Sequence, residues 1–137
     1  MNKTKLLRAV QGICFLDLEN PKKFFVDLLG FNAAHEEEGL LVVERDSVLF
    51  QLGIDPDVAI DVKGNRMMAP LIRIETNDIE SISREIKERY SSGVCPTAIV
   101  KDEEPKLRPW GAKEWGVRDS NNMVILFQEW PASSEEV

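Results

Sequence analysis

The chain has few of the residues that usually mark a catalytic or metal-binding protein. Its 137 residues include one histidine, His35, and two cysteines, Cys14 and Cys95. The cysteines form no CxxC pair, and two reduced, buried thiols are favoured over a disulfide. No Ser/His/Asp set, nucleophile elbow or glycine-rich phosphate loop is present. No catalytic residue and no cofactor is therefore predicted.

Long apolar runs and an excess of positive charge are also missing. No segment approaches the ~20 apolar residues of a membrane span, and the N-terminus does not read as a signal peptide. Lys and Arg number 17 and Asp and Glu 24, a formal charge of −7. An acidic surface repels phosphates, which disfavours nucleic acid; it fits either a cationic ligand or acidity for solubility alone. We expect a cytoplasmic protein with neither nucleic-acid nor membrane partners.

The elements that are present fall into two similar halves. With 43% hydrophobic residues, the chain suits one folded domain. A helix should begin at Asn20-Pro21 and end at Gly30, because asparagine caps helices, proline fits the first turn and glycine ends them. The strands expected in this half are residues 7–16, 31–36, 40–44 and 47–52, the last two forming a hairpin across Arg45-Asp46.

The second half repeats this order. A helix is expected from Asn77 or Asp78 through Tyr90, since apolar residues recur there at helical spacing. The strands expected here are 71–76, 97–101, 110–118 and 123–130, with a charged loop at 102–109, a turn at 119–122 and a frayed tail at 131–137. The half-length period indicates an internal duplication. Each half alone leaves a sheet face uncovered, which pairing within or between chains would close.

Three segments carry a family resemblance. They are residues 16–31, which hold LDLE, FF and LLGF, residues 44–50, ERDSVLF, and residues 109–119, PWGAKEWGVRD. The last looks like the run PWG-x-R-E-F-x-x-R-D, with Lys113 and Trp115 in place of Arg and Phe. On these motifs the chain resembles the glyoxalase/bleomycin resistance protein/dioxygenase superfamily, called vicinal oxygen chelate (VOC), and its bleomycin-resistance branch.

The resemblance implies an α+β fold of two βαβββ modules that form an eight-stranded, half-open, barrel-like cupped sheet around a small-molecule pocket. Residues 1–137 would be a single VOC domain, with modules at 6–54 and 70–131 and a linker at 55–69. Members of the branch pair chains to complete two clefts, so a homodimer is expected. Some members also exchange the N-terminal strand.

Metal-dependent relatives hold a cation with one side chain from each of four strands. The matching positions here are Val10, Gln51, Leu71 and Leu126. Three are aliphatic and cannot bind a hard or borderline cation. A slip of one residue flips each strand's faces. A shift of two leaves only Gln51, Glu75 and Gln128, without a histidine, so no metal is predicted.

Several single residues are candidates for ligand contact. Trp110 is expected at the start of a strand, at the mouth of the barrel, where its ring could stack on a ligand or pack in the core. Trp115 is a candidate wall or core residue. Arg73 and Glu75 alternate with Leu71 and share its strand face, which would look into the cup or open to water.

His35 begins the run His-Glu-Glu-Glu at a strand end. It could act as a base, because histidine titrates near neutrality. A solvated loop histidine is the favoured interpretation, since no partner motif surrounds it.

The leading hypothesis is non-catalytic, metal-free binding of a small organic molecule, an antibiotic or a metabolite. The alternatives are a VOC-type lyase, isomerase or dioxygenase with atypical or absent metal ligands, and a dimeric interaction module with an empty pocket. Leu71 and Arg73 stand where the resistance proteins carry tryptophan. The residues predicted to bind ligand are Trp110, Arg73, Gln51, Trp115, Glu75 and Leu71.

Overall fold

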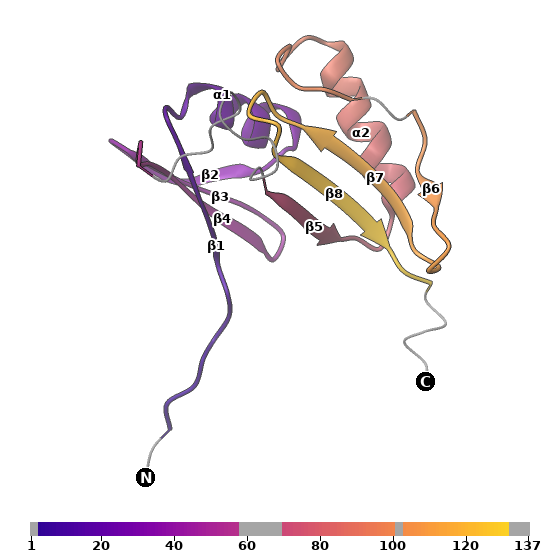
Figure 1. The fold of residues 1–137 in the computed structure, drawn as a ribbon, viewed down its shortest axis with the longest axis horizontal. Helices are drawn as coiled ribbons and strands as arrows, with labels where there is room; N and C mark the ends of the chain where they lie inside the picture. The colour runs from indigo at the N-terminus through magenta and orange to yellow at the C-terminus, as the bar shows by residue number, and fades with distance from the viewer. Residues whose placement is uncertain (1–2, 58–69, 101–102, 132–137) are drawn as a thin grey trace.

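Two four-stranded sheets with helices on one side make up the fold (Figure 1). In this computed structural model, residues 3–57, 70–100 and 103–131 are described. The sheets have the strand orders β1-β4-β3-β2 and β5-β8-β7-β6, so the second repeats the arrangement of the first. The predicted α+β fold of two βαβββ modules is confirmed. Most of the predicted linker and nearly all of the tail lie outside the described residues.

The first module follows the predicted order of elements. They are β1 (Gln11–Phe15), α1 (Glu19–Lys22), the π-helix η1 (Lys23–Leu28), β2 (Asn32–Glu37), β3 (Leu40–Arg45) and β4 (Val48–Ile54). β1 pairs in parallel with β4, and β3 pairs antiparallel with β2 and β4. Gly30, with φ +77°, ends the helix as expected, and Asp46, with φ +53°, allows the tight β3–β4 turn.

The first helix begins earlier than predicted. Leu18 is its N-cap residue and makes no side-chain cap bond. The carboxylate of Asp17 instead accepts a hydrogen bond from the Glu19 amide at 3.0 Å. Asn20 is therefore already inside the helix, and the cap that we assigned to it is wrong.

The second module contains the longer helix. Its elements are β5 (Leu71–Glu75), α2 (Ile79–Ser91), β6 (Lys106–Leu107), β7 (Lys113–Arg118) and β8 (Val124–Glu129). Asp78 caps α2, as predicted, by accepting a hydrogen bond from the Ser81 amide at 3.1 Å. Asn122, with φ +66°, supplies the left-handed residue of the β7–β8 turn.

The expected strand at 97–101 is wrong within its described residues. The amide of Ala98 donates to the carbonyl of Cys95, so the backbone forms a turn there and not an extended strand. Only Ile99 pairs with the next strand, as an isolated bridge to Arg118. The edge strand is instead β6, inside the segment that we expected to be a loop.

The core lies between the sheets and the helices. In the first module Phe25 packs against Phe24, Phe31 and Phe50, with ring centroids 5.2–5.9 Å apart. Residues of α2 contact β7, β8 and η1, so the helix joins its own sheet to the first module. Aromatic pairs of this kind stabilise a core beyond the burial of their area.

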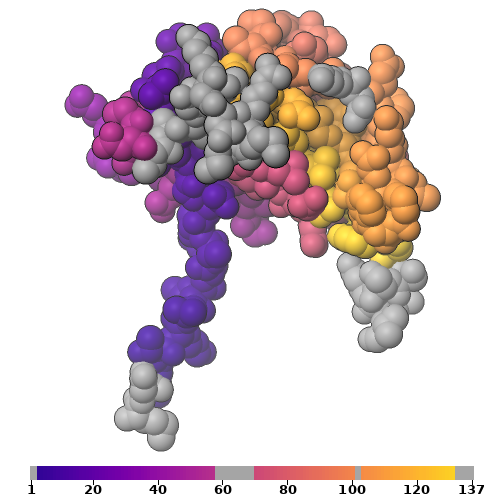
Figure 2. All heavy atoms as spheres, in the orientation of Figure 1, coloured from indigo at the N-terminus to yellow at the C-terminus, as the bar shows by residue number. Residues whose placement is uncertain are grey.

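The N-terminal segment leaves the body of the protein (Figures 1 and 2). The predicted strand at 7–16 is paired only at Gln11–Phe15, and residues 3–10 are all exposed. Leu6 is 100% and Leu7 89% exposed. In the described part of the chain, no helix has both the length and the apolar character needed to cross a membrane.

Candidate ligand-binding site

The face of the second sheet that points away from α2 carries most of the predicted ligand-binding residues. On β5, Leu71, Arg73 and Glu75 are exposed, while Ile72 and Ile74 between them are partly buried against the core. The alternation places the first three on one face, as predicted. At β5 this face is open to solvent, and Arg73 makes no ion pair with another described residue.

A buried carboxylate lies on the same face. Glu114 of β7 is directly opposite Gln128 of β8, which in turn pairs with Glu75 of β5. The side chain of Glu114 is only 4% exposed. Its neighbour Trp115 points to the other side, toward the core. Because side chains alternate between the two faces of a strand, Glu114 lies on the face opposite Trp115. A carboxylate that is this deeply buried usually has hydrogen-bond or ion-pair partners.

Glu114 has three side-chain donors. Its Oε2 accepts hydrogen bonds from Gln128 Nε2 at 2.7 Å and from Trp110 Nε1 at 3.2 Å. Its Oε1 accepts from Arg108 Nε at 3.3 Å. The donors come from β8 and from the turn between β6 and β7. This network satisfies the buried carboxylate and attaches the turn to the sheet.

The network also determines the charge of Glu114. Burial raises the pKa of its carboxyl, because the ionised form loses hydration. The hydrogen bonds from its three donors and the charge of Arg108 outweigh that effect and hold the pKa below its ordinary value of 4.5. The group is therefore a carboxylate at neutral pH.

Trp110 does not begin a strand, contrary to our prediction. It lies in the β6–β7 turn, where the Gly111 amide donates to the Arg108 carbonyl and Gly111 has φ +102°. A positive φ is readily available to glycine and lets the chain reverse there. The Trp110 side chain is 57% exposed although its N–H is held by Glu114. This arrangement leaves a fixed indole open to solvent.

Trp115 and Gln51 lie apart from this group. Trp115 is fully buried and stacks on Phe127 with ring centroids 6.4 Å apart. Its assignment as a ligand-binding residue is therefore corrected: it is a core residue on the helix side of the sheet. Gln51 is exposed on β4, in the separate first sheet, opposite Gly12 and Val42.

His35 lies on β2, and 57% of its side chain is exposed. Its Nε2 is 3.5 Å from Glu37 Oε1 on the same strand. This placement agrees with the interpretation of a solvated histidine.

Sequence reasoning missed Glu114 and Arg108 as site residues and considered Gln128 only as a metal ligand. The available signal was the alternation around Trp115, which puts Glu114 on the opposite face. Among the described residues, no group of three or more His, Cys, Asp or Glu side chains is arranged to hold a metal ion.

Comparison with solved structures identifies the fold. Over 92% of this chain and 100% of the other, the structure is similar to a bleomycin-binding protein in complex with bleomycin, with a TM-score of 0.69 and 16% identity. The bleomycin-binding protein of Streptomyces verticillus, solved with copper(II)-bleomycin, is 21% identical, with a TM-score of 0.64 and coverage of 90% and 96%.

A glyoxalase/bleomycin resistance protein from Catenulispora acidiphila gives a TM-score of 0.67 at 17% identity, with coverage of 92% of this chain and 100% of that one. By sequence, no protein-family model and no curated protein matches the chain. The likeness thus rests on three-dimensional structure, and it confirms at the level of the fold the resemblance carried by the motifs.

Proposed function

We propose that this chain, which has the fold of the glyoxalase/bleomycin resistance proteins, binds a small organic molecule without chemically changing it. The observation that carries the proposal is the indole of Trp110, which is 57% exposed and anchored to the buried carboxylate of Glu114. Ligand sites combine aromatic surface with a few placed polar groups. Arg73, exposed on the same sheet face, would be the polar anchor for an anionic or carbonyl group.

The neighbours in structure support this class of function. Two of them are bleomycin-binding proteins, solved with bleomycin or copper(II)-bleomycin. For this chain we propose a more general property than bleomycin binding, namely binding of a small organic ligand such as an antibiotic or metabolite. The two free cysteines, Cys14 and Cys95, agree with a place in the reducing cytoplasm.

The proposed binding form is a homodimer. A single chain leaves the face of Arg73, Glu75 and Leu71 uncovered, and its N-terminal segment exposes Leu6 and Leu7 almost completely. Contiguous apolar surface that is exposed to water marks interaction sites in many proteins, and Leu6 and Leu7 are adjacent. We propose that a second copy of this chain covers both.

The test is a thermal-shift screen of small molecules that includes bleomycin, followed by titration of each hit while tryptophan emission is recorded. A ligand at the proposed site changes the emission. Trp110→Ala weakens binding by up to about tenfold, since aromatic stacking contributes about 0.5–1.5 kcal/mol beyond burial. Arg73→Ala also weakens binding.

His35→Ala is the control, because His35 is exposed on the far strand of the other sheet. If only this variant loses binding, the site has been assigned to the wrong sheet. Turnover of a hit by the wild-type protein would favour the enzyme alternative over sequestration.

A further inference from the structure

A cleft of about 470 Å³ lies between the two modules, separate from Trp110 and its partners. One wall is the β3–β4 hairpin with the residues after η1, and the other is the end of β5 with the first half of α2. Of the residues that line it, Glu75 also belongs to the sheet face of Arg73 described above. Its volume falls in the range of small-molecule sites in proteins.

The floor of the cleft is apolar. Phe31 and Phe127 are buried core residues, and they line the cleft together with Val48, Ile74 and Ile82. The last three are only partly buried where they pack on the core. Each therefore keeps apolar surface in contact with water, and a ligand with an apolar body would remove that surface from solvent.

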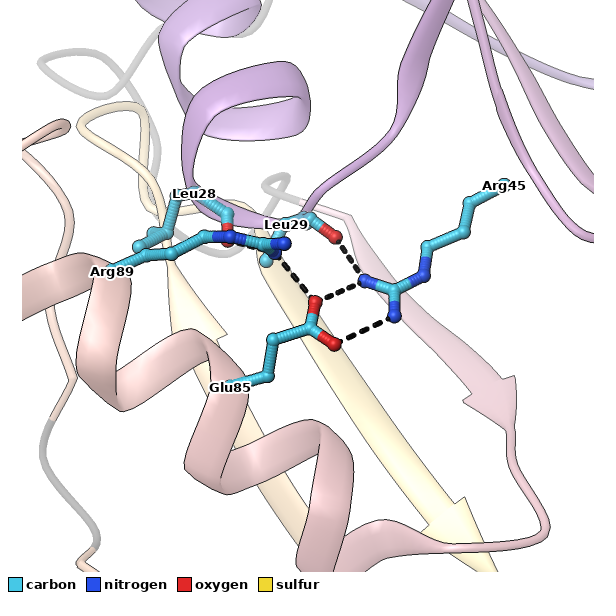
Figure 3. Close-up of polar contacts among 5 residues, drawn as sticks. All are labelled: Leu28, Leu29, Arg45, Glu85 and Arg89. Carbon is cyan, nitrogen blue, oxygen red and sulfur yellow. Dashed lines mark hydrogen bonds and ion pairs between the residues drawn. The ribbon is translucent and has the colours of Figure 1, made fainter.

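An ion-pair cluster connects the two walls of the cleft, with Arg45 on one wall and Glu85 on the other (Figure 3). Glu85 of α2 binds Arg45 of β3 through two hydrogen bonds, Nη1–Oε2 at 2.6 Å and Nη2–Oε1 at 2.9 Å. Its Oε2 also binds Arg89 Nη1 at 2.5 Å. Arg45 further donates to the carbonyl of Leu29 at 2.8 Å. Both guanidinium groups thus form hydrogen bonds within the protein, and these bonds connect the two walls of the cleft without a ligand.

The described residues around the cleft carry a negative charge. Those that line it include four carboxylates, of Asp46, Glu75, Asp78 and Glu85, and one guanidinium, of Arg45, a formal charge of −3 for these groups. Counting Arg89 as well, which binds Glu85 just outside the lining, the charge is still −2. A negative potential above an apolar floor attracts cations and repels anions of the same shape.

We propose that this cleft is a second ligand site, specific for a small organic cation that combines an ammonium group with an apolar body. The apolar body covers Val48, Ile74 and Ile82, and the ammonium group lies toward Asp46 and Glu75 at the rim. The site is formed within one chain and shares Glu75 with the face of Leu71 and Arg73, but it includes neither Arg73 nor Trp110.

The test uses phenethylammonium as the probe and phenylacetate as an anion with a similar apolar body. The full chain, labelled with ¹⁵N, is titrated with each while backbone amide shifts are followed. Phenethylammonium should shift the amides of Ser47, Thr76 and Ser81, which line the cleft. Phenylacetate should not.

Asp46→Asn should weaken phenethylammonium binding about two- to fivefold, the effect of one exposed ion pair. Asparagine also suits the positive φ of Asp46, so the turn is retained. The matched control is Asp27→Asn, which removes an exposed carboxylate from η1 outside the cleft lining. It should leave the affinity unchanged.

Three results would overturn the proposal: equal binding of the anion, absence of amide shifts in the cleft at millimolar probe, or equal losses in the two variants. Shifts confined to the Trp110 indole N–H would assign the cation to the other face. That outcome would reject the cleft while leaving the function of the Trp110 face intact.

Discussion

Arg45 and Glu85, 40 positions apart in the chain, form a two-point ion pair with N–O distances of 2.6 and 2.9 Å. Arg45 ends β3 of the first module, and Glu85 lies in the middle of α2 of the second. The pair is part-buried, with 28% and 34% of the side chains exposed. It therefore joins the two modules directly, in addition to the packing of α2 on η1.

Removing this pair should lower the free energy of unfolding. We expect Arg45→Met and Glu85→Gln each to cost about 1–2 kcal/mol, because bidentate pairs exceed exposed ones but these side chains remain partly solvated. In a double-mutant cycle measured by urea unfolding, the coupling energy should be about 1 kcal/mol. A coupling of zero would contradict a role in joining the modules.

The matched control pair is Lys22–Glu36, which links α1 to β2 inside the first module at 2.8 Å. About half of each side chain is exposed. The cycle of Lys22→Met with Glu36→Gln should give a coupling below about 0.5 kcal/mol.

Acid should selectively weaken the contribution of Glu85. The hydrogen bond from Arg45 lowers the pKa of Glu85 below its ordinary value of 4.5, and this outweighs the opposing effect of burial. Its stabilisation is complete above the pKa of the unfolded chain and is lost as the pH falls through the lower folded-state pKa. The stability gap between wild type and Glu85→Gln should therefore narrow below about pH 4.5.

Thermal unfolding of the two proteins from pH 7 to pH 3 measures this gap. The pKa of Asp119 shifts in the other direction. Burial raises it, and this outweighs the lowering effect of the hydrogen bonds from Met123 and Asn121. Both proteins contain Asp119, so its effect cancels in the difference. A gap that widens in acid would contradict the assigned sign.

The donors around Glu114 make that residue more sensitive than an exposed carboxylate. Glu114→Gln places an amide among three donors, so at least one donor loses its acceptor. We expect a loss of about 1–3 kcal/mol in the free energy of unfolding and a shift in Trp110 emission. The same change at exposed Glu75 should cost less than about 0.5 kcal/mol. Equal effects at the two positions would mean that the network does not stabilise the sheet.

The exposed leucines of the N-terminal segment should determine self-association. If a second copy covers Leu6 and Leu7, the double variant Leu6→Ser/Leu7→Ser loses apolar burial and weakens the dimer by about tenfold or more. Sedimentation at micromolar concentration measures this. The control on the same segment is Lys3→Ser/Lys5→Ser, which should dimerise normally. A wild-type protein that sediments as a monomer would contradict the dimer itself.

Metal content separates binding from metal-dependent catalysis. Protein purified without chelators should hold zinc, nickel, iron and manganese at well below one ion per chain. The positions expected to supply ligands include the aliphatic Val10, Leu71 and Leu126, so a bound cation would lack a coordination shell. One tightly held ion per chain, measured by elemental analysis, would favour the enzyme alternative.

The local features of this chain could be read from sequence. Asp78 as a helix cap, Gly30 as a helix end and Asn122 as a left-handed turn residue each depend on a few neighbouring residues. The alternation of Leu71, Arg73 and Glu75 likewise follows from strand geometry alone. The repeated order of elements indicated two similar modules, and the resemblance carried by the motifs implied how they form the fold.

Contacts between distant residues were decided only by the tertiary structure. Ile99 and the two residues of β6 both pair with β7, but the turn at Cys95–Ala98 leaves Ile99 as an isolated bridge, whereas Lys106–Leu107 forms the edge strand. Glu114 became the centre of a network because Gln128, 14 positions away, faces it across the sheet. The cleft exists because the β3–β4 hairpin meets α2. Burial and hydrogen bonding depend on which segments meet in space, and a local pattern carries no information about that.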